Sequence, residues 1–225
     1  MVGWPKFEVV RGLKPQPLRF FDNDNLVVVY NPHFDQTVSS WHPMGLQVLD
    51  FFVENRDVNC IFAPHVVLFR RSKRHHAFLP KQYYDSPNIL IDTDSAALSE
   101  MTYILAADIY LGDVSSQVYE FLLEPRPCIF LNGHGVAWQG NPYYFHWTLG
   151  QVVDDVPVGL GPALAQAFVS HPHFLPKQRE AFAYTFRTEP GGTAARRGAD
   201  AIATFLRDGA LPVVGGQRMR PSLRA

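Results

Sequence analysis

LAADIYLGDVSSQVYEF, residues 105–121, is the stretch that decides the fold. It contains a short apolar run, Asp108–Leu111, which is typical of a buried strand. Small and polar residues follow at Gly112–Ser116 and predict a turn. The apolar spacing from Ser115 to Leu123 then predicts a helix with a serine at its start. Strand, turn and helix in this order form the repeating unit of a parallel sheet.

The same pattern recurs along the chain. Short apolar runs predict further strands, and apolar residues at helical spacing predict helices between and after them. Uniformly apolar strands indicate a parallel sheet that is covered on both faces. We therefore expect an α/β fold with a doubly wound, Rossmann-like parallel sheet and a helical C-terminal segment. The predicted strands are 26–30, 60–63, 88–92, 108–111, 127–131 and 150–153, and the predicted helices are 43–54, 98–107, 115–123, 162–170, 177–186 and 195–206.

The domain limits follow from changes in composition. Residues 1–25 contain three prolines and little periodicity, which predicts a lead-in or linker segment. Residues 26–207 carry the strands and helices and form the predicted domain. Residues 208–225 are rich in glycine, proline and arginine, and we expect a flexible tail there.

Composition excludes several classes of protein. The chain has 225 residues, 47% of them hydrophobic, and a formal net charge of −1. No apolar stretch approaches the roughly 20 residues of a membrane span, and the N-terminus lacks the pattern of a signal peptide. Near-neutral charge argues against a nucleic-acid partner. We expect Cys60 and Cys128 to be reduced, buried thiols of a cytoplasmic protein, and we expect no metal site and no cofactor.

Candidate binding residues follow the predicted strands, because ligands of open parallel sheets bind beyond the carboxyl ends of the strands. Asp113, Ser115 and Ser116 lie between a strand and a helix, where N–H groups and hydroxyls suit a phosphate. Glu120 lies one turn further along the same helix face as Ser116 and could accept hydrogen bonds from a ribose. The alternative is an ordinary helix cap.

Three other loops carry polar residues at expected strand ends. His65 follows the second strand, and the alternatives are a phosphate contact or a structural histidine. Asn31, His33, Ser39 and Ser40 follow the first strand, and His134 follows the fifth between two glycines. Each of these loops could support a ligand or be a plain surface turn. The basic run Arg70, Arg71, Lys73 and Arg74 could be a solvated surface or could contact anionic lipid headgroups.

The motif at 105–121, followed by Pro127–Leu131, resembles the CDP-glycerol glycerophosphotransferase family. Segments elsewhere follow the family order: Val2–Phe7, Val29–Pro32, Pro64-His65 and Gly192–Ala199. Two positions depart from the family motif around His65, where Ala63 and Val66 replace an arginine and a proline. The resemblance covers nearly the whole chain but only the C-terminal half of the family's GT-B glycosyltransferase architecture.

The resemblance implies a function and a set of contacts. It implies a transferase domain that binds a nucleotide donor, such as CDP-glycerol or a nucleotide sugar, in the synthesis of teichoic-acid-like cell-surface polymers. Ser115, Ser116 and His65 would contact the diphosphate and Glu120 the ribose, and His65 is a weak catalytic candidate. An N-terminal acceptor domain or a partner chain would complete the enzyme, at the inner face of the membrane. The alternatives are a binding module without turnover and an epimerase-like domain.

Overall fold

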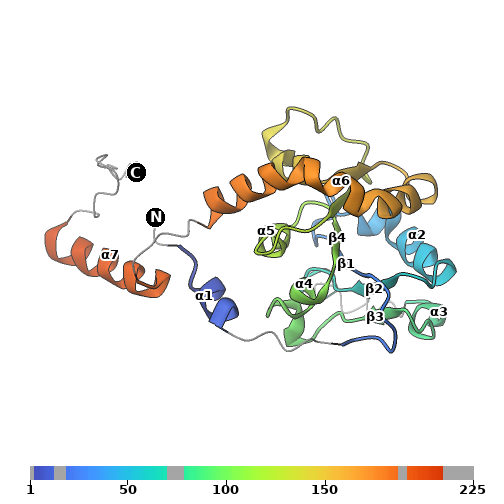
Figure 1. Cartoon of the computed structure of the whole chain (residues 1–225), viewed down its shortest axis with the longest axis horizontal. Coiled ribbons are helices and arrows are strands. Elements are labelled where there is room, and N and C mark those ends of the chain that lie inside the picture. Colours follow the sequence, from blue (N-terminus) through green and yellow to red (C-terminus); the bar gives the residue numbers. More distant parts are fainter. Residues whose placement is uncertain (1–2, 13–18, 70–78, 187–191, 210–225) are drawn as a thin grey trace. The chain divides into compact units, whose positions relative to one another are not determined.

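The structure is a computed structural model that describes residues 3–12, 19–69, 79–186 and 192–209. Its central element is a six-stranded sheet in which all the paired strands run parallel, in the order β3-β2-β1-β4-β5-β6. Figure 1 shows helices on both sides of the labelled strands. The predicted α/β class and doubly wound parallel sheet are therefore confirmed. The strands are β1 (Val27–Asn31), β2 (Asn59–Phe62), β3 (Ile89–Ile91), β4 (Ile109–Gly112), β5 (Cys128–Leu131) and β6 (Gln151–Val153).

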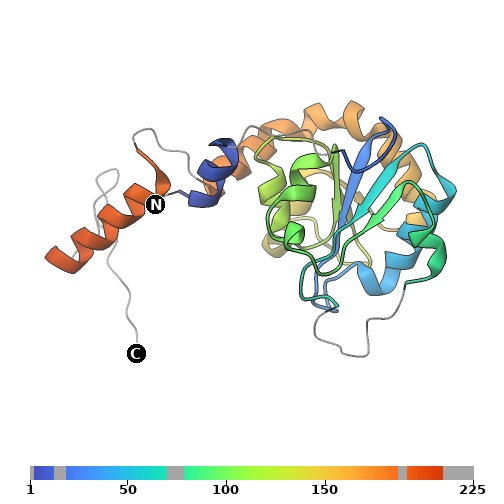
Figure 2. The ribbon, with the colours of Figure 1, turned by 90° about the horizontal axis from the view of Figure 1, so that it is seen from below.

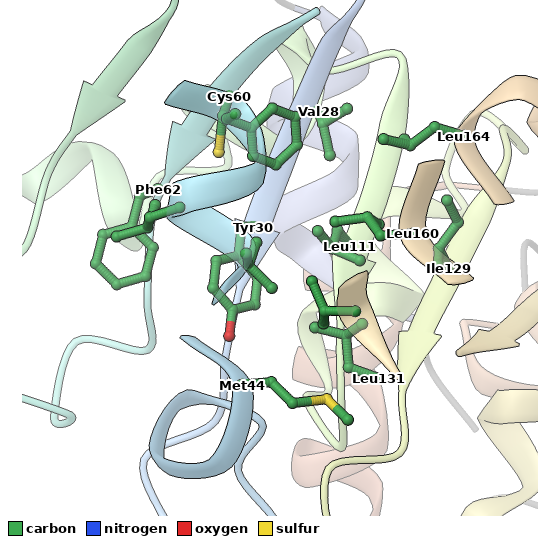
Figure 3. Close-up of a cluster of buried hydrophobic side chains, with 14 of the residues drawn as sticks. Val28, Tyr30, Met44, Cys60, Phe62, Leu111, Ile129, Leu131, Leu160 and Leu164 are labelled. Atoms are coloured by element: carbon green, nitrogen blue, oxygen red, sulfur yellow. The ribbon is translucent and has the colours of Figure 1, made fainter. Parts of the chain in front are cut away.

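One face of the sheet packs against α2 (Trp41–Glu54), α3 (Lys81–Tyr84) and the first part of α6 (Val156–Thr185). Alternate strand residues point to this face, since successive side chains of a strand face opposite ways. Figure 3 shows Tyr30, Phe62, Leu111 and Leu131 among them, with Leu160 of α6 packed nearby. This uninterrupted apolar layer explains why the strands have so few polar residues.

The other face is covered by α4 (Thr102–Ala106) and α5 (Gln117–Phe121), as the two views in Figures 1 and 2 show. Arg126 closes this side. Its guanidinium donates to the carbonyls of Ile104, Leu105, Ala107 and Phe121 and lies 4.0 Å from the centre of the Phe121 ring. These carbonyls belong to helix ends that have no partners of their own, so one side chain satisfies the ends of two short helices.

Two helices on this face are shorter than the sequence predicts. The predicted helix 98–107 is divided into η1 (Ala96–Leu98) and α4, because Met101 adopts a left-handed φ of 64°. The predicted helix 115–123 is reduced to the five residues of α5. A short helix has a weak N-terminal dipole, which lowers the expected contribution of α5 to phosphate binding.

The C-terminal helices also differ from the prediction. The predicted helices 162–170 and 177–186 form one continuous helix, α6, of 30 residues. Its three internal prolines, Pro162, Pro172 and Pro176, are exposed, and the solvent side is where a helix can lengthen its hydrogen bonds. Gln178 holds α6 to the sheet by donating to the carbonyls of Arg126 and Leu149. None of the described helices is long and apolar enough to cross a membrane.

The chain forms two compact units, 1–16 with 181–225 and 17–180. The larger unit holds the sheet. In the smaller unit α1 (Pro5–Gly12), which the sequence analysis missed, packs against α7 (Ala194–Asp208) and places Phe7 between Phe182 and Phe186. Glu8 accepts from the backbone of Ala194 at the start of α7. The expected domain limits 26–207 differ from these units and stay a prediction, and most of the expected tail lies outside the described residues.

Two glycines provide a test of the packing. A Cβ at Gly150 would overlap the carbonyl oxygen of Cys128, whereas one at Gly161 in α6 would lie 3.5 Å from Phe51. We expect Gly150→Ala to lower the free energy of unfolding by about 1–3 kcal/mol through overpacking. Gly161→Ala, the matched control, is expected to raise it by about 0.5–1 kcal/mol. Urea denaturation of both variants measures the difference, and a neutral Gly150→Ala would contradict this account.

Candidate functional site

The topology places the candidate site. The strand order reverses between β1 and β4, which are neighbours in the sheet although β2 and β3 lie between them in sequence. In open α/β sheets the crevice at this reversal, at the carboxyl ends of the strands, is the usual ligand site. The loops after β1 and β4 begin there, because Asn31 is aligned with Gly112 at the ends of the two strands.

Asp113 joins these loops. Its side chain is fully buried and accepts hydrogen bonds from the backbone N–H groups of His33, at 3.0 Å, and Ser40, at 2.6 Å. The Ser40 hydroxyl donates to the same carboxylate at 2.8 Å and accepts from Tyr30 at 3.0 Å, and the N–H of Val114 completes the set. A buried charge is costly unless it is hydrogen-bonded in this way. Asp113 therefore fixes the loop after β1 and the start of α2 against the end of β4.

Burial and hydrogen bonding act against each other on this carboxyl group. Burial raises the pKa of Asp113, and the donors from Ser40, Val114 and His33 offset part of that rise. The sequence analysis placed Asp113 in a supporting loop, which gave no indication of its burial.

The carbonyl of Asp113 has two further partners that the sequence analysis missed. His146 and Trp147, in η2 (Pro142–Leu149), donate to it from their ring N–H groups at 3.0 and 2.9 Å. Burial lowers the pKa of His146 to about 4, so the ring is neutral at pH 7. The only sequence signal was the aromatic richness of residues 138–147, which does not specify a partner 33 residues away.

The turn after β4 separates its two serines. Ser115 is buried, and its hydroxyl accepts from the backbone of Gln117 at 3.3 Å, which is the role of a cap. Ser116 is exposed, and its side chain makes no capping hydrogen bond. Glu120 is half-buried and close enough to Tyr110 to raise the pKa of that phenol, which burial raises most. Of the two serines, Ser116 is the one that presents its hydroxyl to solvent.

The rings of His33, Phe34 and His65 pack against one another. The ring centres of the two histidines are 5.6 Å apart, and the Phe34 ring lies 4.3 Å from His33 and 4.7 Å from His65. The backbone N–H of His65 also donates to the carbonyl of Pro32. Burial, and secondly the nearby His33, lower the pKa of His65. Residues after β1 and after β2 therefore form one cluster, which we call the imidazole cluster: His33, Phe34 and His65.

The remaining predicted loop residues hold the structure together. Asn31 is buried, donates to the carbonyl of Ala63 and accepts from Tyr110, which links three strands. Ser39 is buried and accepts from the N–H of Trp41. His134 is exposed, and its ring N–H donates to the carbonyl of Ser39 at 3.0 Å, so the loop after β5 contacts the start of α2.

Other predictions have a simpler outcome. Arg70, Arg71, Lys73 and Arg74 lie outside the described residues. The described side chains include no cluster of three or more potential metal ligands, and the expectation of no metal and no cofactor stays a prediction. A hollow of about 330 Å³ lies beside β6 and α6, from Gln151 to Gln166, and none of the predicted site residues lines it.

Comparisons with known proteins identify the fold. No protein-family model matches the sequence, and no curated protein matches it. Among solved structures, a variant of the wall teichoic acid polymerase TagF has a TM-score of 0.53 at 17% identity, over 91% of this chain and 48% of that one. TagF itself has a TM-score of 0.51 at 16% identity, over 84% and 46%. The chain thus spans about half the length of these structures and has a GT-B glycosyltransferase-like fold.

The buried His146 gives a pH-dependent prediction. Its pKa in the folded chain is about 4, whereas an unfolded histidine titrates near 6.5. The unfolded state therefore binds more protons between these values, and stability is lost as the pH falls through this window. We expect the titration of His146 to lower the free energy of unfolding by about 2 kcal/mol between pH 7 and pH 5.

His146→Gln keeps an N–H donor for the Asp113 carbonyl but does not titrate. Urea denaturation at pH 7 and pH 5 gives the free energy of unfolding that each protein loses between the two pH values. The contribution of His146 is the loss in the parent minus the loss in the variant. If the parent and the variant lose the same unfolding free energy, the pKa of His146 in the folded chain must be close to that of an unfolded histidine.

Proposed function

We propose that this chain is the nucleotide-donor-binding domain of a GT-B transferase, which moves a glycerophosphate or glycosyl group from a nucleotide-activated donor to a hydroxyl acceptor in cell-surface polymer synthesis. One observation carries the proposal. The strand-order reversal between β1 and β4 gathers hydrogen-bond donors and a carboxylate from the loops after β1, β2 and β4 at one edge of the sheet. Edges of this kind bind nucleotides in many α/β proteins.

The residues at this edge suit the parts of a nucleoside diphosphate. The exposed hydroxyl of Ser116 and the ring N–H group of His65 are neutral donors for diphosphate oxygens. Glu120, one turn after Ser116, is an acceptor for ribose hydroxyls. Charge-assisted hydrogen bonds of both kinds are roughly twice as strong as neutral ones. His65 fits the role of hydrogen-bond donor to the phosphate oxygens of the leaving nucleotide better than that of a catalytic base, because its Nδ1 already accepts the N–H of Val67. The leaving nucleotide is the monophosphate in glycerophosphate transfer and the diphosphate in glycosyl transfer.

The identity of the donor is part of the proposal. One of the similar structures is a variant of TagF soaked with CDPG, which has a TM-score of 0.51 with this chain. This supports a cytidine nucleotide as the first ligand to test. A thermal-shift screen with CDP, UDP and GDP tests the proposal, because a ligand that binds only the folded state raises its stability. No shift with any of the three at millimolar concentration would contradict it.

A binding module without turnover is the second candidate, because the Nδ1 atom of His65, the one catalytic candidate, already accepts the N–H of Val67. Both candidates require nucleotide binding. They differ in turnover, which an assay for nucleotide release from CDP-glycerol by the pure chain measures. We expect no turnover from this chain alone, since the proposed acceptor site would be supplied by another domain or chain.

The two serines give a prediction with an internal control. We expect Ser116→Ala to weaken nucleoside diphosphate binding about tenfold, because one hydrogen bond to a charged group is lost. Ser115→Ala is expected to leave affinity within about twofold and to lower stability by about 1 kcal/mol, since Ser115 caps the turn. Calorimetric titration and urea denaturation measure the two effects. The reverse pattern would assign the ligand contact to Ser115.

Glu120 is tested by comparing sugars. We expect Glu120→Gln to reduce affinity for the ribonucleotide CDP about fivefold or more, because a hydrogen bond to a charged acceptor becomes a neutral one. Affinity for 2′,3′-dideoxy-CDP is expected to change by less than about twofold. An equal loss with both ligands would mean that Glu120 acts through the fold and not on the ribose.

A further inference from the structure

The imidazole cluster contains a repeated local geometry. The Nδ1 atom of His33 accepts the backbone N–H of Asp35, at 3.1 Å, and the Nδ1 atom of His65 accepts that of Val67, at 3.2 Å. In both cases the donor is two residues further along the chain. Asparagine and aspartate side chains often accept from the same position in Asx-turns. Two histidines on neighbouring strand ends thus make the same turn.

This geometry determines where the proton of each ring lies. An Nδ1 atom that accepts a hydrogen bond carries no hydrogen, so the neutral ring carries its proton on Nε2. Among the described residues, neither Nε2 atom has a hydrogen-bond partner. The lowered pKa of His65, caused by burial and then by His33, keeps that ring neutral near pH 7. Each ring therefore presents one neutral N–H donor.

The position of His33 links both sides of the candidate site. Its backbone N–H donates to the Asp113 carboxylate at 3.0 Å, which fixes it to the turn that carries Ser116. Its ring centre lies 5.6 Å from that of His65. His33 is thus the residue that is held by the loop after β4 and packs beside the loop after β2.

We infer that His33 and His65 form a two-donor clamp for a phosphoryl or diphosphate group, in which the Nε2–H of His33 is a second ligand contact beside that of His65. The inference rests on the proposed function and extends it to His33. It assigns the ligand class by chemistry: a group with at least two anionic oxygens a few ångströms apart. Two neutral donors suit such a group because their hydrogen bonds to it are charge-assisted.

Paired substitutions separate the donor from the turn. His33→Asn keeps an acceptor for the Asp35 N–H and removes the Nε2 donor. His33→Gln also removes the ring but carries an N–H₂ group that reaches about as far as Nε2. We expect His33→Asn and His65→Asn each to lower the affinity for CDP about tenfold, and His33→Gln to restore most of it. His173→Asn, an exposed position on α6, is the control and is expected to bind like the parent.

Three ligands distinguish the possible outcomes in calorimetric titrations: CDP, cytidine and inorganic pyrophosphate. The clamp requires that His33→Asn weaken CDP and pyrophosphate but leave cytidine affinity unchanged. If the parent binds CDP and His33→Asn binds it within twofold of the parent, the clamp is wrong and the proposed function stands. If the parent binds pyrophosphate through His33 but no nucleoside diphosphate, the clamp stands and the proposed function is wrong. Binding of neither ligand overturns both.

Discussion

The buried carboxylate of Asp113 is the interaction on which the arrangement of this sheet edge depends. The carboxylate accepts hydrogen bonds from the loop after β1, from the start of α2 and from its own loop. The backbone carbonyl of Asp113 accepts hydrogen bonds from His146 and Trp147. A buried charge that loses one of its partners destabilises a fold far more than the complete interaction stabilises it. The loops that carry the proposed ligand contacts are therefore fixed by a polar centre that is itself fully buried.

The strands were predictable because their signal is local. A parallel sheet covered on both faces needs short runs of apolar residues, and each predicted run overlaps an observed strand. The helices were less predictable where contacts distant in sequence determine where a helix begins and ends. Met101 interrupts a periodic segment because its backbone adopts a left-handed conformation. The prolines of α6 do not divide it, because they lie on its exposed side while Leu160 and Leu164 are buried in the core.

The candidate site was predictable by position but not by role. Residues after strand ends were expected to meet at one edge, and His33, His65 and Asp113 are joined there. Two neighbouring serines, however, have different environments. Ser115 is a buried cap and Ser116 is exposed, and nothing in a Ser-Ser pair distinguishes them. Their roles depend on the direction of the chain after Asp113, which is set by residues 33, 40, 146 and 147.

The shortness of α5 changes the physical basis of the proposed binding. A long helix that starts after β4 would bind phosphate mainly through its dipole and its free N–H groups. A helix of five residues has a weak dipole, and the backbone N–H groups of Gln117, Val118 and Tyr119 already donate to Ser115 and Ser116. Donors must then come from side chains at several strand ends, and their mutual distances are set by the sheet and by Asp113. The affinity of such a site for a diphosphate depends on loop geometry, so substitutions that loosen Asp113 should weaken binding as strongly as substitutions of the donors themselves.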